Sequence, residues 1–148
     1  MMRVTTIGFT QKGAERFFAL LGEARVRRVV DVRLRPESQL SGYAKGRDLA
    51  FFLQRLLGVH YRHEPLLAPS PEILTAYKNR KAMSWTEYER RFLELMAERR
   101  IERRLRPEDF EDACLLCSEH LPHRCHRRLV AEYLRDCWRI PMRLEHLK

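Results

Sequence analysis

The sequence predicts a single α/β domain over residues 1–148, with a largely parallel sheet of about four to five strands flanked by helices. Three observations predict this class. Short apolar segments alternate with amphipathic segments of helical spacing, which is the pattern of βαβ units. The chain has 148 residues, of which 45% are hydrophobic, enough for one sizeable core. It contains no internal repeat, low-complexity tract or obvious domain boundary.

The first part of the chain is predicted to form a strand, a helix and a second strand. Residues 2–9, MRVTTIGF, have the composition of a strand. Residues 13–22, GAERFFALLG, carry apolar residues at helical spacing, with Gly22 as the expected stop. Residues 27–36, RRVVDVRLRP, form the second strand, which the proline closes.

A loop, a helix and a weaker strand follow. Residues 37–46, ESQLSGYAKG, are rich in turn residues and form the loop. Residues 47–58, RDLAFFLQRLLG, are predicted to form a helix that ends at Gly58. Residues 59–67, VHYRHEPLL, form the third strand.

Residues 65–112 contain the longest stretch without a predicted strand, and we expect a helical excursion over the sheet there. Residues 70–80 begin with Ser70 at an N-cap position, followed by proline. Residues 84–100 form a longer amphipathic helix, whose Ser84 and following glutamate have capping-box spacing.

The C-terminal part completes the alternation. Residues 113–117, ACLLC, read as a short buried strand, and residues 125–137, CHRRLVAEYLRDC, as a helix. Residues 142–147, MRLEHL, form a last strand or a tail.

Polar residues follow the predicted strands, and in an open parallel sheet ligands bind outside the carboxyl ends of the strands. If the sheet is parallel, these side chains share one edge and we expect them to line one crevice. They are Thr10, Asp31, Arg33, His63, Glu64, Cys117 and Glu119. Asp31 and Arg33 alternate on one strand face, so a structural ion pair is an equal alternative to a functional role.

The start of the last predicted helix is unusually basic. Its residues are Arg124, Cys125, His126, Arg127 and Arg128. The first turn of a helix is already the positive end of its dipole, so a phosphate, a carboxylate or Glu119 is expected to balance the charge. The same field would lower the pKa of Cys125 and make it a better nucleophile. The alternative is that Arg127 and Arg128 point into solvent and Cys125 packs as a small apolar residue.

The four cysteines are Cys114, Cys117, Cys125 and Cys137. In a cytosolic protein of this size we expect them to be buried, reactive or metal-bound in preference to disulfide-paired. The disulfides of hyperthermophile proteins are an exception, which the excess of arginine over lysine leaves open. Cys114 is predicted to be buried and inert, and its position in ACLLC places it on the strand face opposite Cys117. A zinc site is an alternative; its ligands would be Cys117, His120, His123, Cys125 and His126. The loop of cysteine phosphatases and rhodaneses does not match in spacing or charge.

The net charge of +9 favours anionic partners such as nucleotides, nucleic acids or phosphorylated metabolites. The alternative is an arginine-rich surface with paired charges, because acids and bases alternate in residues 89–109. No basic stripe with interleaved aromatics is present. The apolar runs are too short for a bilayer, and the N-terminus lacks a secretory signal, so we expect a cytoplasmic protein without a membrane partner.

Four segments of the chain form a recognisable set: TIGFT, VVDVRLRPES, LGVHYRHEPLL and LLCSEHLPHRCHRRLVAEYL. Together, and in this order, they resemble the motifs of the DUF488 family of small prokaryotic proteins. The resemblance implies an α/β fold and assigns no activity. The positions that match the family motifs are Thr10, Asp31, Arg33, Cys117, Glu119, Cys125, His126 and Arg127. The chain departs from the family after the third strand, where LLAPS replaces a leucine-glycine-glycine turn.

The leading functional hypothesis is an enzyme or enzyme-like domain with an anionic, phosphate-bearing or nucleotide-like substrate. Cys125 or Cys117 would be nucleophile or ligand, with His126 as acid, base or hydrogen-bond donor. Glu119 and Asp31 would orient groups or accept protons. The substrate would be held by Arg33, Arg127, Thr10 and Arg124. The alternatives are a non-catalytic module that binds nucleic acid or nucleotide, and a structural zinc domain. No cofactor follows from the sequence.

Overall fold

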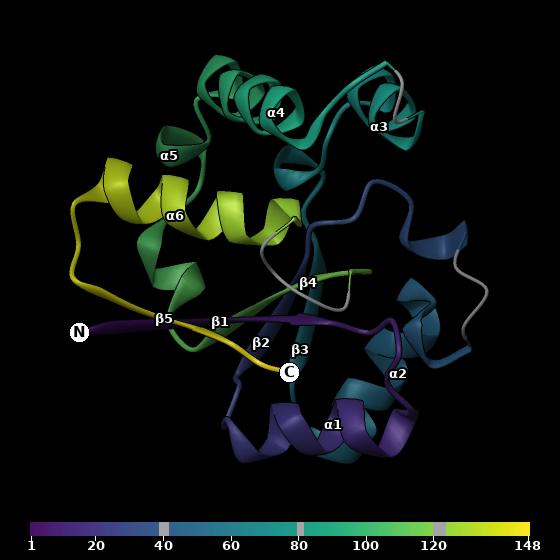
Figure 1. Cartoon of the computed structure of the whole chain (residues 1–148). Helices are drawn as coiled ribbons and strands as arrows, with labels where there is room; N and C mark the ends of the chain where they lie inside the picture. Colours follow the sequence, from purple (N-terminus) through teal and green to yellow (C-terminus); the bar gives the residue numbers. More distant parts are fainter. Residues whose placement is uncertain (39–41, 80–81, 120–123) are drawn as a thin grey trace.

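A computed structural model describes residues 1–38, 42–79, 82–119 and 124–148 of the chain. In this part of the chain five strands form one sheet, in the order β3-β2-β4-β1-β5, with all neighbours parallel (Figure 1). The strands are β1 (Met2–Gly8), β2 (Arg28–Asp31), β3 (His60–His63), β4 (Ala113–Cys117) and β5 (Met142–His146). The predicted α/β class, the parallel sheet and its number of strands are confirmed.

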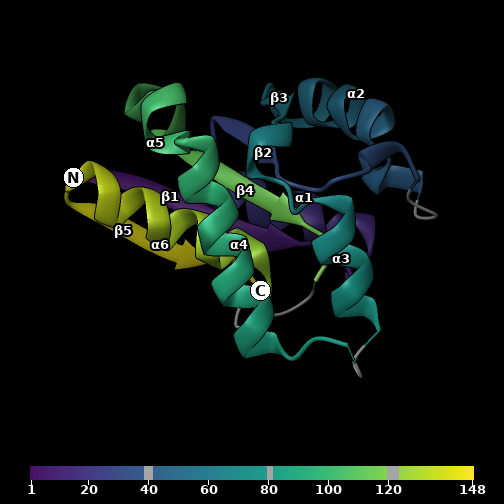
Figure 2. The same ribbon diagram turned by 90° about the horizontal axis from the view of Figure 1, so that it is seen from above.

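Helices cover both faces of the sheet, as Figures 1 and 2 show. One face carries α1 (Ala14–Glu23) and α2 (Gly46–Leu57). The other carries α3 (Pro71–Lys78), α4 (Trp85–Arg99), the short α5 (Ile101–Arg104) and α6 (His126–Trp138). The helical excursion expected between the third and fourth strands is α3 to α5, followed by the 3-10 turn η4 (Pro107–Phe110).

The sheet separates two apolar cores because successive side chains of a strand point to opposite faces. In β4, Cys114 belongs to the buried cluster that contains Phe17 of α1 and Leu53 of α2, whereas Cys117 belongs to the cluster on the other face, which contains Phe92 of α4. The expectation that the two cysteines of ACLLC lie on opposite faces is therefore confirmed.

The predicted helix starts are confirmed where a serine caps them. The Ser70 hydroxyl accepts a hydrogen bond from the Ile73 N–H at 3.2 Å, and the Ser84 hydroxyl accepts one from the Glu87 N–H at 3.2 Å. The predicted end of α1 at Gly22 is wrong, since the helix continues to Glu23. Gly22 instead allows close helix packing: a Cβ there would lie 3.3 Å from the Leu57 side chain of α2.

The second strand ends at Asp31 and not at the predicted Pro36, and three further segments differ in detail from the prediction. The third strand is shorter than residues 59–67, because Pro65 opens the 3-10 turn η3 (Pro65–Leu67). The loop after the second strand contains the 3-10 turns η1 (Pro36–Ser38) and η2 (Gly42–Ala44). The last segment, predicted as strand or tail, is the strand β5 beside β1.

Within the described ranges, the helices are all too short or too polar to cross a bilayer.

Candidate functional site

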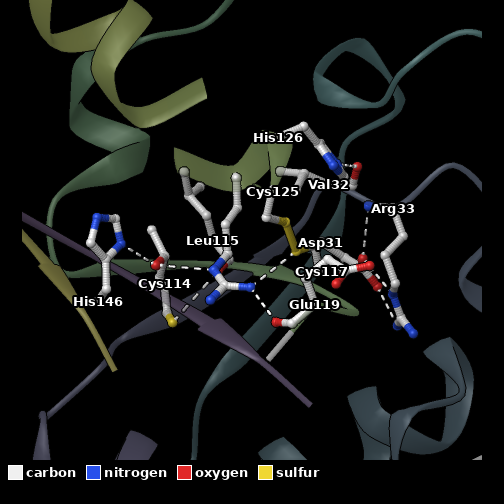
Figure 3. Close-up of a disulfide and its surroundings, with 12 residues drawn as sticks. Asp31, Val32, Arg33, Cys114, Leu115, Cys117, Glu119, Cys125, His126 and His146 are labelled. Carbon is white, nitrogen blue, oxygen red and sulfur yellow. Dashed lines mark hydrogen bonds and ion pairs between the residues drawn. A yellow bond between two sulfur atoms is a disulfide. The ribbon is translucent and has the colours of Figure 1, made fainter. Parts of the chain in front are cut away.

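The predicted common edge exists because every strand runs in the same direction. In the sheet register Gly8 at the end of β1 is opposite Cys117, and Asp31 at the end of β2 is opposite Leu116 and His63. The N-terminus of α6 lies over this edge, where the Nε2 atom of His126 is 2.7 Å from the Val32 carbonyl oxygen (Figure 3).

Asp31 and Arg33 form the ion pair that the sequence offered as one alternative. Arg33 Nε and Nη2 donate to the two Asp31 oxygens at 2.9 and 2.7 Å, and the Arg33 N–H donates to Oδ1 at 3.1 Å. The Tyr61 hydroxyl donates to Oδ2 at 2.5 Å. Burial and then the Asp31 charge raise the pKa of Tyr61, so the phenol keeps its proton. Asp31 is fully buried, and with four donors its carboxylate serves to fix the Arg33 guanidinium.

One nitrogen of Arg33 is left without a hydrogen bond. Within the described residues, the buried Nη1 atom has no partner, although Arg33 is only 6% exposed. The guanidinium carbon lies 5.2 Å from the centroid of the Phe9 ring. An unsatisfied buried donor costs about 1–3 kcal/mol, so this group calls for an acceptor.

Arg127 points into the protein, and the alternative that it points into solvent is wrong. Its side chain is fully buried. Nε donates to the Thr6 hydroxyl at 3.2 Å, while Nη1 donates to Cys117 Sγ at 3.2 Å and to the Glu119 carbonyl oxygen at 2.5 Å (Figure 3). Burial lowers the pKa of Arg127 to about 10, which keeps the guanidinium charged at neutral pH. These contacts hold the strand ends to α6.

The other basic residues at the start of α6 differ in their surroundings. Burial lowers the pKa of His126 to about 4, so its imidazole adds no charge at neutral pH. Arg128 pairs with Glu132 one turn later, with an N–O distance of 2.9 Å. Arg124 is exposed. The charge that an anion would have to balance is therefore smaller than the sequence indicates.

Cys117 and Cys125 are joined by a disulfide (Figure 3). The expectation of unpaired cysteines is therefore wrong for this pair. Cys117 ends β4 and Cys125 is the N-cap of α6, so the two cysteines lie at the same edge of the sheet. Both are buried, with 1% and 3% of their surface exposed. Cys114 and Cys137 are free thiols.

Three of the five residues suggested as zinc ligands are described, and they lie together. A ring nitrogen of His126 and the sulfur atoms of Cys117 and Cys125 all lie within 4.8 Å of one another. The other two suggested ligands, His120 and His123, lie outside the described residues.

The two free cysteines should differ in reactivity. Cys114 is fully buried, and burial raises the pKa of its thiol to about 12. Cys137 is exposed on α6. A thiol reagent added to the native protein should label Cys137 rapidly and leave Cys114 unlabelled until unfolding. Peptide mapping by mass spectrometry measures both; equal labelling at early times would contradict the prediction.

The remaining candidates lie at the rim of the edge. Thr10 is exposed, and its N–H donates to the Ser118 carbonyl oxygen at 3.0 Å, which ties the β1 loop to the β4 loop. The residue Glu119 is exposed, although its carbonyl contacts Arg127. His63 Nε2 is 2.7 Å from the Arg33 carbonyl oxygen. Glu64 is buried and pairs with Arg62 at 2.8 Å.

Two residues of the edge were missed by the sequence analysis. Tyr61 lies in a segment whose strand pattern is weak in the sequence. Its position two residues before His63, on the same face of the strand, is the signal that could have identified it. Lys12 is only 9% exposed, and its pKa is lowered by burial and then by the charges of Arg127 and Arg16. Burial is the larger cause, and the smaller contributions of Arg127 and Arg16 show that other cations lie near Lys12.

A cavity of about 240 Å³ lies along β2 and β3, beside η4. Its lining residues include Arg28, His60, Arg62, Glu64 and Asp109. The cavity therefore differs from the crevice expected among Asp31, Arg33, Glu119 and Arg127.

Comparison with known proteins identifies one family. Residues 13–134 match the model of DUF488, a domain of unknown function. The TIGFT segment lies before the matched range. Neither the curated proteins nor the solved structures give a match. Because the match covers most of the chain, this protein belongs to the DUF488 family.

Proposed function

We propose that this protein is an intracellular enzyme or enzyme-like domain that holds an anionic, phosphate-bearing or nucleotide-like substrate at the C-terminal edge of its sheet. The observation that carries the proposal is the buried Nη1 atom of Arg33, a charged donor without an acceptor in the described part of the chain. An anion oxygen would supply that acceptor.

The surroundings of Arg33 suit a binding group whose orientation is fixed before the ligand arrives. Asp31 holds Nε and Nη2, and Tyr61 in turn holds Asp31. The guanidinium therefore loses little further freedom when it binds, which favours affinity. In this proposal Asp31 is a positioning residue, and Arg33 contacts the substrate.

The electrostatics of the edge support an anion as well. The neighbouring charges of Arg127 and Arg16 add to burial in lowering the pKa of Lys12, because each cation is destabilised by the others. A bound anion would relieve this repulsion. Arg124 and Thr10 are both exposed, and in this proposal they are further contacts for the substrate.

The chemical groups beside the anion site are Cys117, Cys125, His126 and Glu119. The exposed carboxylate of Glu119 is suited to accept protons. The lowered pKa of His126 suits its uncharged imidazole to hydrogen bonding or to ligation rather than to proton transfer. The cysteines become nucleophiles or ligands only after the disulfide is reduced. The guanidinium of Arg127 already donates to Cys117 and to the Glu119 carbonyl oxygen, so Arg127 positions these residues and is not proposed to contact the substrate.

The Arg33→Lys variant tests the anion site. Lysine keeps a positive charge beside Asp31 but has no second terminal nitrogen, so the free donor is lost. Phosphate at millimolar concentration should raise the melting temperature of the parent protein more than chloride at matched ionic strength. In Arg33→Lys this difference should disappear.

The control is Arg143→Lys, an exposed arginine on β5, which should respond to phosphate as the parent does. Stabilisation by salting-out should be the same in Arg143→Lys and Arg33→Lys, so it cancels when their melting temperatures are compared. A parent that responds equally to phosphate and chloride would refute the anion site. So would an Arg33→Lys variant that keeps the full phosphate response.

A further inference from the structure

We propose that the reduced pair Cys117 and Cys125 binds a divalent cation of the zinc class together with His126. The three side chains come from two elements, the end of β4 and the start of α6. Two sulfur atoms and a ring nitrogen lie within 4.8 Å of one another, close enough to share one ion. A donor set of two thiolates and one imidazole is typical of zinc.

The tautomer of His126 leaves one ring nitrogen for the metal. Nε2 lies 2.7 Å from the Val32 carbonyl oxygen, which can only accept a hydrogen bond, so Nε2 carries the proton. Nδ1 then keeps its lone pair. Metal-binding histidines usually donate their second N–H to a carbonyl or carboxylate in this way, which fixes the ring.

The backbone spacing of the two cysteines also suits a metal bridge. Their Cα atoms lie 7.6 Å apart, beyond the roughly 4.4–6.8 Å that is usual between disulfide-linked cysteines. Two Zn–S bonds of about 2.3 Å at a tetrahedral ion hold their sulfur atoms roughly 3.8 Å apart and therefore need a wider backbone spacing.

The charge of the site is compatible with a dication, although Arg127 lies beside it. Two thiolates carry two negative charges, which balance the ion. Arg127 Nη1 is 3.2 Å from Cys117 Sγ, where its N–H can donate to a metal-bound thiolate. The described residues provide three ligands, and a tetrahedral ion has room for a fourth.

The disulfide and the metal site exclude each other, so loading requires reduction. A dithiol reductant transfers two electrons and two protons to the Cys117–Cys125 disulfide, which gives two thiols and the oxidised, cyclic disulfide of the reductant. The cation then displaces the two thiol protons, which pass to the buffer as two metal–sulfur bonds form. An intracellular reducing environment would supply reductants of this class.

Cobalt(II) is the probe that tests the site, because thiolate-bound tetrahedral Co²⁺ has charge-transfer and strong d–d absorption. The protein is first reduced by a phosphine, which is then removed under nitrogen, and it is titrated with Co²⁺ in buffer without phosphate. We expect one equivalent to produce these bands in the reduced parent and none in the protein oxidised beforehand. Zn²⁺ should displace the cobalt and remove the bands.

The variants Cys117→Ser and Cys137→Ser form a matched pair. Cys137 is exposed and free, so its serine variant should bind cobalt like the parent, whereas Cys117→Ser should bind at least tenfold more weakly and lose the charge-transfer band. The comparison of reduced and oxidised parent protein needs no variant and stands if Cys117→Ser does not fold. Absence of the bands in the reduced parent, equal bands after oxidation, or equal bands in a folded Cys117→Ser would overturn the site.

The metal site does not depend on an anion at Arg33. Arg33→Lys should bind cobalt like the parent. Each proposal can therefore be tested, and can fail, independently of the other.

Discussion

Gly8→Ala is expected to destabilise the folded state by about 3 kcal/mol, at the upper end of what overpacking usually costs. A Cβ built on Gly8 would overlap the Glu119 carbonyl oxygen, and would lie 2.6 Å from its carbonyl carbon and 2.7 Å from Arg127 Nη1. Backbone atoms cannot rotate away as a flexible side chain can. The strand end or the Glu119 loop must therefore move, and the hydrogen bond from Arg127 to Glu119 must break or lengthen.

Gly42→Ala is the matched control. A Cβ on Gly42 would meet no atom of the described structure within 4 Å, so this variant should stay within about 0.5 kcal/mol of the parent. Urea denaturation under the same reducing conditions measures both free energies of unfolding. If Gly8→Ala unfolds at the same urea concentration as Gly42→Ala, the close approach of β1 to Glu119 is not a constraint on the fold.

The sequence predicted most of the fold because the relevant signals are local. The spacing of apolar residues predicts the alternation of strands and helices. The helix caps at Ser70 and Ser84 each involve a hydrogen bond to a residue only three positions along the chain. Gly22 misled the prediction, since glycine marks both helix ends and close helix packing. The close approach of Gly22 to Leu57, 35 residues away in the chain, gives this glycine a role in helix packing that its position in the sequence does not show.

The common edge of the site was also predictable, because parallel strands place their carboxyl ends together. The contacts made there were not. The pairing of Cys117 with Cys125 depends on how β4 and α6, which hold the two residues at their ends, are placed relative to each other. The partner of Asp31 beyond Arg33 is Tyr61, on a neighbouring strand. Neither contact follows from the spacing of residues within one element. The sequence therefore predicted which residues lie at the edge but not which of them pair with each other.

The contacts of Arg127 at the start of α6 could not be predicted from the sequence either. A run of basic residues at a helix N-terminus predicts a demand for an anion. The structure meets part of this demand within the protein: Thr6, Cys117 and the Glu119 carbonyl surround the Arg127 guanidinium. The buried Arg127 therefore stabilises the edge of the sheet through these hydrogen bonds, whether or not a ligand binds beside it.

Arg127→Ala is therefore expected to destabilise the folded state by about 4 kcal/mol. Truncation of a fully buried side chain leaves a cavity, and cavities of this kind cost roughly 2–5 kcal/mol. The Glu119 carbonyl and the Thr6 hydroxyl also lose a charged donor. Removal of a desolvated charge offsets part of this loss, because burial already lowers the pKa of Arg127 to about 10.

Two further variants separate the causes. Arg128→Ala, one residue along, removes a partly exposed pair with Glu132 and should cost less than about 1 kcal/mol. Arg127→Met refills most of the volume without the charge or the donors, so it should recover the part of the loss that comes from the cavity. Chemical denaturation of the three variants gives this partition. If Arg127→Ala is no less stable than Arg128→Ala, the buried guanidinium does not hold the strand ends to α6, and the edge must be fixed by the disulfide and the His126 contact with Val32 instead.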